Sequence, residues 1–159
     1  MKVEIEKLNI YHSTLDFDCG DEEVNSFFER SFEEVELKNS QVYVITGEDQ
    51  IIGFYAISMA SIRAEISGMT LRHPVSLIGQ LGVNKPFQGQ GYGSYILDIA
   101  VKKARNVSKE IGCKGLIIET YKDELVDSLY KKKGFYLLDK RDMKGKDQKH
   151  ILFFKFQSD

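Results

Sequence analysis

The sequence predicts a mixed α/β fold, in which helices flank a central mixed sheet. A chain of 159 residues has the size of one ordinary domain, so residues 1–159 are expected to form a single domain. A hydrophobic share of 42% and a charged share of 29% exclude a disordered chain. Segments with strand periodicity and segments with helix periodicity follow one another in an order that predicts one sheet covered by helices.

The first half of the chain predicts one strand, one helix and then a hairpin. Val3 and Ile5 indicate a short strand, and Asp21 is placed to cap a following helix. Apolar residues at helical spacing predict an amphipathic helix over residues 22–37. Runs of β-branched and aromatic residues predict the hairpin; its strands are residues 42–46 and 51–58.

The second half predicts alternating strands and helices. Residues 61–75 fit no single pattern, and His73–Pro74 is expected to form an irregular entry to the next strand. Gly79 and Gly82 inside that strand favour a bulge or a ligand close to the backbone. The expected elements are a strand at 75–83, a helix from the glycine-rich segment to Ile111, a strand at 115–120, a helix at about 123–133 and a strand pair at 135–138 and 150–156.

Composition excludes several classes of protein. The two cysteines and three histidines have no zinc-ligand spacing, and two isolated thiols suit a reducing cytosol, so we expect a cytoplasmic protein. No apolar run approaches the length that crosses a bilayer, and the first residues lack the apolar core of a signal peptide.

Charge is distributed unevenly along the chain. Residues 1–79 hold 6 basic and 14 acidic side chains, whereas residues 80–159 hold 16 basic and 10 acidic side chains. The basic second half is compatible with an anionic ligand, but the charges alone favour a solvated surface.

A glycine-rich segment, Gln88-Gly89-Gln90-Gly91-Tyr92-Gly93, lies between a predicted strand and a predicted helix. Backbone N–H groups in such a loop, together with the helix N-terminus, can hold a phosphate or pyrophosphate. A tight turn that needs positive φ is the structural alternative. The Walker pattern fails because no Lys follows the last glycine, and the dinucleotide fingerprint fails because this loop follows the fourth strand rather than the first.

A third phosphate-binding pattern fits this loop better. Gln88-x-x-Gly91-x-Gly93 after a strand ending Gln80-Leu81-Gly82-Val83 resembles the acyl-CoA loop of the GNAT N-acetyltransferases. A later segment, Tyr130-Lys131-Lys132-Lys133-Gly134-Phe135, resembles the second signature of that family. The two segments stand in the family's order, with one helix and one strand between them.

A narrower resemblance is to the GNAT toxins of toxin–antitoxin pairs, which acetylate aminoacyl-tRNA. It rests on Phe17-Asp18-Cys19-Gly20 before an acidic helix, on Ile52-Gly53-Phe54-Tyr55, and on Pro74 ahead of Leu77-Ile78-Gly79-Gln80-Leu81-Gly82-Val83. Gln80 and Asn84 depart from that pattern, which usually has Arg and Asp at these positions.

The resemblance implies a fold, a cofactor and a site. It implies the GNAT fold, with a mixed, mostly antiparallel central sheet flanked by helices, and an enzyme that transfers an acetyl group from acetyl-CoA to a primary amine by direct attack in a ternary complex. It also implies that the Leu81 N–H polarises the acetyl carbonyl, that residues 81–83 pair with the pantetheine arm and that the loop N–H groups hold the pyrophosphate. The implied cofactor-binding residues are Leu81, Gly82, Val83, Gln88, Gly89, Gln90, Gly91, Tyr92, Gly93 and Ser94.

Tyr130 is the predicted general acid. A phenol of pKa about 10 stays protonated at pH 7 and can protonate a departing thiolate. Its position alone suggests a Tyr packed on a helix, and the family signature is what favours catalysis. No base is assigned: Glu119, Asp123 and His73 are the candidates, because the strand before the loop holds no carboxylate. An α-amine of pKa about 8 needs a base less than a Lys amine does, which favours such an acceptor.

Other functions and partners stay open at this stage. One is a toxin that acts on aminoacyl-tRNA and is held inactive by a small antitoxin. Another is an acyl-CoA-binding module that senses without catalysing. A homodimer is expected by analogy with many GNAT proteins. A basic surface is expected to meet the CoA 3′-phosphate or tRNA, or else to be solvated; it comprises Lys131, Lys132, Lys133, Lys140, Arg141, Lys144, Lys146 and Lys149.

Overall fold

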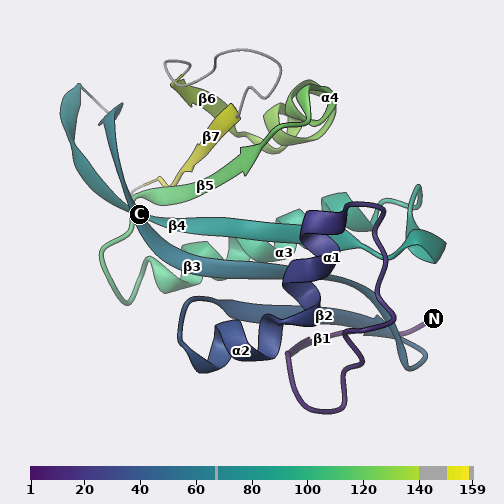
Figure 1. Ribbon diagram of the computed structural model, residues 1–159. Helices are drawn as coiled ribbons and strands as arrows, with labels where there is room; N and C mark the ends of the chain where they lie inside the picture. Colours follow the sequence, from purple (N-terminus) through teal and green to yellow (C-terminus); the bar gives the residue numbers. More distant parts are fainter. Residues whose placement is uncertain (67, 140–149, 158–159) are drawn as a thin grey trace. The chain divides into compact units, whose positions relative to one another are not determined.

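The computed structural model describes residues 1–66, 68–139 and 150–157 (Figure 1). Its residues form two compact units, and each unit collects segments that are distant in the sequence. Unit 1 comprises Met1–Ser58 and Gly79–Ala100, and unit 2 comprises Met59–Ile78 and Val101–Asp159. The hydrogen-bonded strand order is β1-β2-β3-β4-β5-β7-β6. The pairing of β4 with β5 is parallel, and the other described registers are antiparallel, which confirms the predicted mixed and mostly antiparallel sheet.

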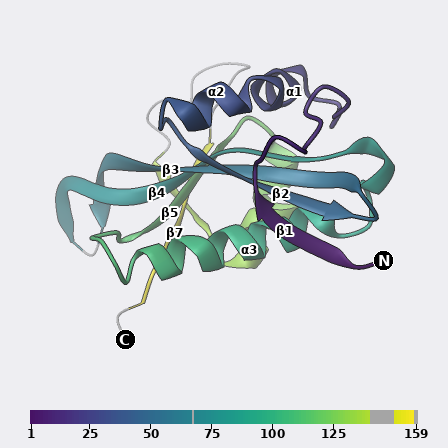
Figure 2. The same ribbon diagram turned by 90° about the horizontal axis from the view of Figure 1, so that it is seen from below.

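Unit 1 contains the N-terminal strands and the helices that cover them. Its elements are β1 (Val3–Lys7), α1 (Glu22–Glu29), α2 (Ser31–Glu36), β2 (Gln41–Gly47), the first part of β3 (Gln50–Ile66), the end of β4 (Met69–Val83), the short helix η1 (Lys85–Phe87) and the start of α3 (Tyr92–Val107). Figure 2 shows α1 and α2 on one face of β2 and β3, with α3 on the opposite face. Phe28 of α1 packs with Phe17 and Phe54, and the ring centroids of Phe28 and Phe54 are 4.3 Å apart.

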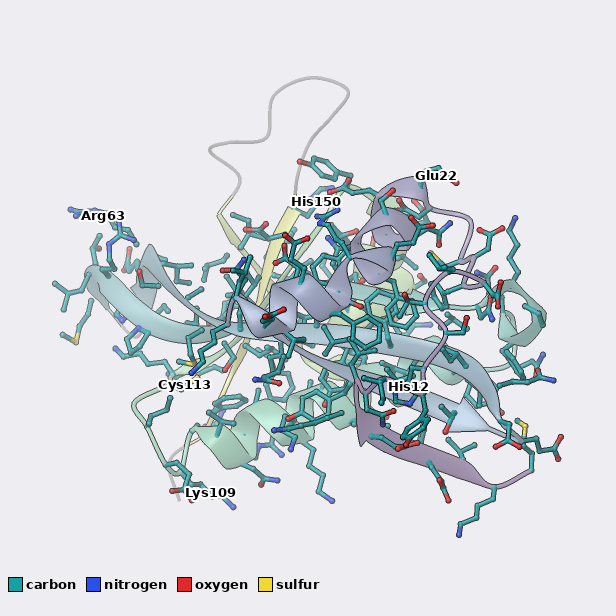
Figure 3. The ribbon with its side chains drawn as sticks, turned by 60° about the horizontal axis from the view of Figure 1, so that its bottom comes forward. His12, Glu22, Arg63, Lys109, Cys113 and His150 are labelled. Carbon is teal, nitrogen blue, oxygen red and sulfur yellow. The ribbon has the colours of Figure 1, made fainter. Side chains whose placement is uncertain are left out.

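Unit 2 contains the end of β3, where Arg63 lies (Figure 3), the first part of β4 and the C-terminal strands. Its further elements are β5 (Gly115–Thr120), α4 (Asp123–Leu125), η2 (Val126–Tyr130), η3 (Lys131–Lys133), β6 (Tyr136–Asp139) and β7 (His150–Lys155). Val75, Ile117 and Phe153 form the centre of its apolar core. Gly115 lies so close to the Phe154 carbonyl and the Phe153 ring that a Cβ at this position would overlap them.

The predicted helix over residues 22–37 is wrong in one respect, because the structure divides it into α1 and α2. Asp21 caps α1 as predicted, and its carboxylate accepts the backbone N–H groups of Glu23 and Val24. The break lies at Arg30, whose φ of −98° and ψ of 13° leave the helical region. Ser31 Oγ then donates to the Phe28 carbonyl at 2.6 Å, and such local side-chain bonds compete with the helical pattern.

Two further expectations, about where β4 begins and where α3 ends, are also wrong. His73 and Pro74 lie within β4 instead of forming an irregular entry, and residues 61–66 extend β3. Pro74 has no N–H to donate, and the described pairing of β4 with β5 begins only at Ser76, so no donor is needed there on the β5 side. Its carbonyl accepts the Lys114 N–H at 2.9 Å. Helix α3 ends at Val107, so Ile111 is no member of its apolar face and is 51% exposed.

Tyr55 in β3 buries a hydroxyl group that has no hydrogen-bond partner among the described residues. Its ring stacks on Tyr43 with centroids 5.1 Å apart, and burial, followed by the influence of Tyr43, raises the pKa of its phenol. A buried hydroxyl without a partner costs free energy, because the group loses water and gains nothing. Tyr55→Phe is therefore expected to raise the free energy of unfolding by about 1 kcal/mol in urea titration. A loss of about 1 kcal/mol would instead mean that the hydroxyl is satisfied in solution.

Among the described residues, no helix combines the length and the hydropathy that crossing a bilayer requires.

Candidate active site

The glycine-rich segment connects η1 to α3 in unit 1 and exposes its backbone. Gly89 and Gly91 have φ values of 75° and 89°, a conformation that strains residues with a Cβ. A Cβ added at either glycine would meet nothing within 4 Å. The glycines are therefore required by the backbone conformation and not by close packing. The open side of the turn leaves room for a ligand against the main chain.

Helix α3 begins at the end of this turn. Tyr95 donates its backbone N–H to the Gly91 carbonyl at 3.1 Å, which closes the first helical turn. The preceding N–H groups, those of Tyr92, Gly93 and Ser94, consequently have no acceptor within the helix. These N–H groups and the positive end of a 16-residue helix dipole favour an anion at this turn.

The end of β4 presents a second set of backbone groups in the same unit. The Asn84 N–H donates to the Ile52 carbonyl of β3 at 2.8 Å. Alternate residues of a strand direct their N–H groups to opposite sides. The N–H groups of Leu81 and Val83 therefore point to the edge of β4 that faces away from β3. The described pairing of β4 with β5 covers only Ser76–Ile78, so this edge is not used by β5 at Leu81.

Gly82 has a packing role that the sequence did not predict. A Cβ at Gly82 would lie 2.9 Å from Val24 Cγ1 and 3.2 Å from the Phe17 ring. The residue thus allows α1 and the segment before it to approach β4. A Cβ at Gly79, by contrast, would meet nothing within 4 Å, so this position is open.

The side chain of Gln88 holds the loop instead of facing a ligand. Its Nε2 donates to the carbonyls of Cys19 and Val83, both at 2.8 Å. Gln90 similarly folds back, and its Nε2 donates to the Pro86 carbonyl at 3.1 Å. The side-chain amides of both Gln residues thus stabilise the loop conformation, and the backbone remains as its binding surface.

Asp18 and Asn25 are site residues that the sequence did not predict. The Asp18 carboxylate accepts the Gly20 N–H and the Asn25 amide at 2.9 Å each, and it pairs with Lys85 Nζ at 3.0 Å. In the sequence, Asp18 stands out only as part of a family resemblance. The signal that could have drawn attention to it is the Asp-Cys-Gly turn beside the Asp21 cap.

These hydrogen bonds predict a pH dependence of stability. Lys85, then Asn25 and the Gly20 N–H, lower the pKa of Asp18 from 3.8 to about 2. Because the folded-state pKa is depressed, the stabilisation is present above pH 3.8 and is lost as the pH falls toward 2. The melting temperature of Asp18→Asn is therefore expected to lie below that of the parent at pH 6 and to approach it near pH 2. A difference that stays constant over this range would contradict the assignment.

Tyr130 lies in unit 2, at the end of η2. It is 6% exposed, and its ring meets Phe135 edge-on with centroids 6.1 Å apart. Burial raises the pKa of its phenol, so the hydroxyl stays protonated at neutral pH. The predicted helix is thus present, but its middle turn is a π-helix, a local widening that is often found at functional sites. Gly134 ends the helical segment with a φ of 99°, as predicted.

The candidate bases have different environments within unit 2. His73 is 1% exposed, and its Nε2 contacts the carbonyls of Ala64 and Met69 at 3.1 and 3.2 Å. Since both neighbours only accept, Nε2 carries the proton, and the ring ties β3 to β4. Glu119 is exposed on β5, and the side chain of Asp123 lies outside the described residues. No base is therefore assigned from the geometry.

The expected basic surface is only partly within the described residues. Lys131 Nζ forms an ion pair with Asp127 at 3.0 Å, four residues earlier, so one charge of the expected basic surface is paired within its own helical segment. Lys140, Arg141, Lys144, Lys146 and Lys149 lie outside the described residues. Cys19 and Cys113 form no disulfide, and Cys113 Sγ lies 3.3 Å from Ser76 Oγ (Figure 3).

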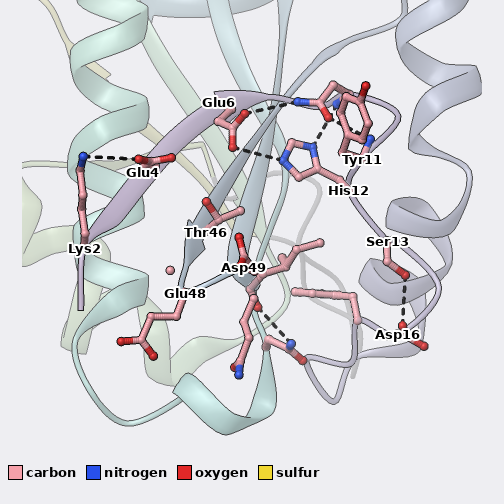
Figure 4. Close-up of a pocket in the computed structure, with 16 residues that line it drawn as sticks. Lys2, Glu4, Glu6, Tyr11, His12, Ser13, Asp16, Thr46, Glu48 and Asp49 are labelled. Atoms are coloured by element: carbon pink, nitrogen blue, oxygen red, sulfur yellow. Dashed lines mark hydrogen bonds and ion pairs between the residues drawn. The ribbon is translucent and has the colours of Figure 1, made fainter.

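Unit 1 also contains an acidic pocket of about 670 Å³ that the sequence did not predict (Figure 4). It is bordered by β1, the loop after it and the β2–β3 turn, with Glu4, Glu6, Glu48 and Asp49 on its walls. His12 lies at its edge, 3.7 Å from Glu6. None of the predicted site residues lines it.

The edge of β4, the glycine-rich turn and the helical segment that carries Tyr130 follow one another along the chain in the predicted order. The sequence model of the Acetyltransferase (GNAT) domain matches residues 38–137, more than half of the chain. The chain belongs to the GNAT family. This GNAT chain carries both family segments, one in each unit: the glycine-rich turn in unit 1 and Tyr130 in unit 2.

Three similar proteins extend the comparison. A tRNA-acetylating toxin of Mycobacterium tuberculosis (strain ATCC 25618 / H37Rv) is 29% identical over 91 residues, which are 54% of this chain and 55% of that protein. The chain thus spans about half the length of this curated relative. The structure of AtaT complexed with acetyl-methionyl-tRNAfMet has a TM-score of 0.81 at 24% identity, covering 97% of this chain and 95% of that one. The structure of AtaTR bound with AcCoA has a TM-score of 0.78 at 25% identity, with 96% and 93% covered.

Proposed function

We propose that this GNAT chain is an N-acetyltransferase that moves an acetyl group from acetyl-CoA to a primary amine. The observation that carries the proposal is the turn at Gly89 and Gly91, whose positive φ values and open side leave backbone N–H groups available at the start of α3. A pyrophosphate is the ligand that such a turn binds best. Family membership and the likeness to AtaTR bound with AcCoA support acetyl-CoA as the donor.

Backbone groups are proposed to bind the donor along two segments. Residues 88–94 hold the pyrophosphate through their N–H groups. Leu81, Gly82 and Val83 pair with the pantetheine arm in the manner of an added strand, for which the edge of β4 beyond Ile78 is available. Acetyl-CoA supplies the activated thioester, and the Leu81 N–H then polarises its carbonyl. An oxyanion donor of this kind contributes about 3–4 kcal/mol to transition-state stabilisation.

Tyr130 is proposed to complete the reaction as the general acid. The amine nitrogen attacks the acetyl carbon directly, the carbon–sulfur bond breaks, and Tyr130 protonates the departing thiolate. The attacking nitrogen loses its extra proton to solvent or to a group that the geometry does not single out.

We propose that residues 1–159 form one domain, because β3, β4 and α3 each run from one unit into the other.

The acceptor we favour is the α-amine of aminoacyl-tRNA. The tRNA-acetylating relative and the likeness to AtaT complexed with acetyl-methionyl-tRNAfMet support this choice. An α-amine of pKa about 8 is partly neutral at pH 7, which suits a chain without an assigned base. On this proposal the chain is a toxin of the cytoplasm that a small antitoxin neutralises, with a homodimer as the expected assembly.

A screen of acceptors tests this function. Release of free CoA thiol is measured with small amines, with Lys-containing peptides and with a set of charged tRNAs. We expect thiol release with charged tRNA that stops when the α-amine is blocked in advance. Thiol release only with small amines would refute the tRNA acceptor and keep the acetyltransferase. Binding of acetyl-CoA without release in any mixture would instead identify a non-catalytic acyl-CoA sensor.

A further inference from the structure

We propose that the Asp18 turn, defined as Asp18–Gly20 together with Asn25, positions the glycine-rich loop for acetyl-CoA. This inference rests on the proposed function, since it assigns positioning residues to the same binding site. The turn lies more than sixty residues before the loop in the sequence, and its contacts to the loop all fall within unit 1.

The Asp18 turn is closed by its own hydrogen bonds. The Asp18 carboxylate accepts the Gly20 N–H and Asn25 Nδ2, and Asn25 Oδ1 in return accepts the Cys19 N–H, each at 2.9 Å. Gly20 has a φ of 91°, so only glycine follows this path without strain. Asn25 is 9% exposed within α1, which anchors the turn to the helix. The turn thus presents its outer backbone groups in one conformation.

Those outer groups bind the residues that lead into the loop. The Asp18 N–H donates to Asn84 Oδ1 at 3.2 Å, and the Asp18 carbonyl accepts the Lys85 N–H at 2.9 Å. The Asp18 carboxylate also pairs with Lys85 Nζ at 3.0 Å. Finally, the Cys19 carbonyl accepts Gln88 Nε2 at 2.8 Å. The chain is therefore held at three points, Asn84, Lys85 and Gln88, before it reaches Gly89.

Gln88 connects this support to the end of β4. Its Nε2 donates to both the Cys19 carbonyl and the Val83 carbonyl, so it joins the turn to the strand that carries the Leu81 N–H. The loop N–H groups that we propose for the pyrophosphate and the Leu81 N–H that we propose for the acetyl carbonyl are then held at a fixed distance from each other before acetyl-CoA binds. A preorganised site loses less entropy on binding, and the benefit appears as affinity for acetyl-CoA.

The position of Asp18 separates this role from general stabilisation. Its side chain is 50% exposed and that of Lys85 is 60% exposed, and exposed ion pairs contribute little to the stability of a fold. The core beside them is formed by Phe17, Phe28 and Phe54, which a change at Asp18 leaves in place. Loss of the Asp18 contacts should therefore affect binding of the donor more than folding.

The experiment compares Asp18→Asn and Gln88→Met with the parent chain and with Asp16→Asn as the control. Asp16 lies two residues earlier, and its carboxylate accepts the Ser13 hydroxyl at 3.1 Å rather than a donor of the glycine-rich loop. We expect the Kd for acetyl-CoA by calorimetry, and the KM for acetyl-CoA, to rise about tenfold in both variants. The kcat at saturating donor should stay within about twofold, as expected for lost ground-state positioning. Asp16→Asn should match the parent.

A double-mutant cycle with Lys85→Gln shows through which partner Asp18 acts. If Asp18 positions the loop through Lys85, the double variant should lose no more affinity than the single variant with the larger loss. Additive losses would mean that Asp18 and Lys85 act independently and would overturn that step. Unchanged affinity in both Asp18→Asn and Gln88→Met would overturn the inference, as would a loss of affinity that disappears when both variants are measured well below their melting temperatures. If the parent itself binds no acetyl-CoA, the proposed function fails with it.

Discussion

Tyr130→Phe is expected to lower kcat by about 10²- to 10⁴-fold while the Kd for acetyl-CoA stays within about twofold. The substitution removes only the hydroxyl, and the buried ring keeps its edge-on contact with Phe135. Without the proton of Tyr130, the thiolate must leave unprotonated or take its proton from water, and either route raises the barrier. Thiol release under saturating donor and acceptor measures the loss, and calorimetry measures the binding.

The matched control for this change is Tyr136→Phe. Tyr136 lies six positions later on β6, and burial raises the pKa of its phenol as it does for Tyr130. Its removal should leave kcat within about twofold, because no role in the transfer is proposed for it. A fully active Tyr130→Phe would remove Tyr130 from the mechanism. Since burial raises the pKa of Tyr130, the parent should also show no loss of rate from this group between about pH 6 and 9.

Gly91→Val is expected to raise the KM for acetyl-CoA by about tenfold to a hundredfold. The φ of 89° at Gly91 disfavours any residue with a Cβ, by about 1–2 kcal/mol, and a β-branched side chain by more. A Cβ at this position would meet nothing within 4 Å, so the loop can relieve the strain by changing its path. That relief removes the inward N–H groups, and binding of the pyrophosphate is lost while the fold is kept.

Gly112→Val separates the strain from the added bulk. Gly112 also has open space around it, but its φ lies outside the positive range, so the same side chain is accommodated there without strain. We expect Gly112→Val to bind acetyl-CoA like the parent and to melt within a few degrees of it. Normal affinity of Gly91→Val, measured by calorimetry, would show that the turn is not the pyrophosphate site.

Local patterns predicted much of the fold and part of the site. The cap at Asp21, the strand at 115–120 and the helix stop at Gly134 depend on neighbouring residues, and all three are present. The glycine-rich turn belongs to this group, because positive φ at Gly89 and Gly91 is a local requirement. The extent of β3 and β4 was not predicted, since these neighbouring strands of the sheet include residues 61–66 and 69–75 by pairing rather than by their own periodicity.

The sequence by itself determined the family, the order of strands and helices, and the turn at Gly91, because each depends on residue types at short spacing. Only the tertiary structure decided that Gln88 is engaged with Cys19, 69 residues away, and that Asp18 meets Asn84, 66 residues away. Such contacts arise when separate segments pack on one sheet, and no local pattern encodes which distant carbonyl an amide will reach. For this reason the loop could be identified from the sequence, whereas the residues that hold it could not.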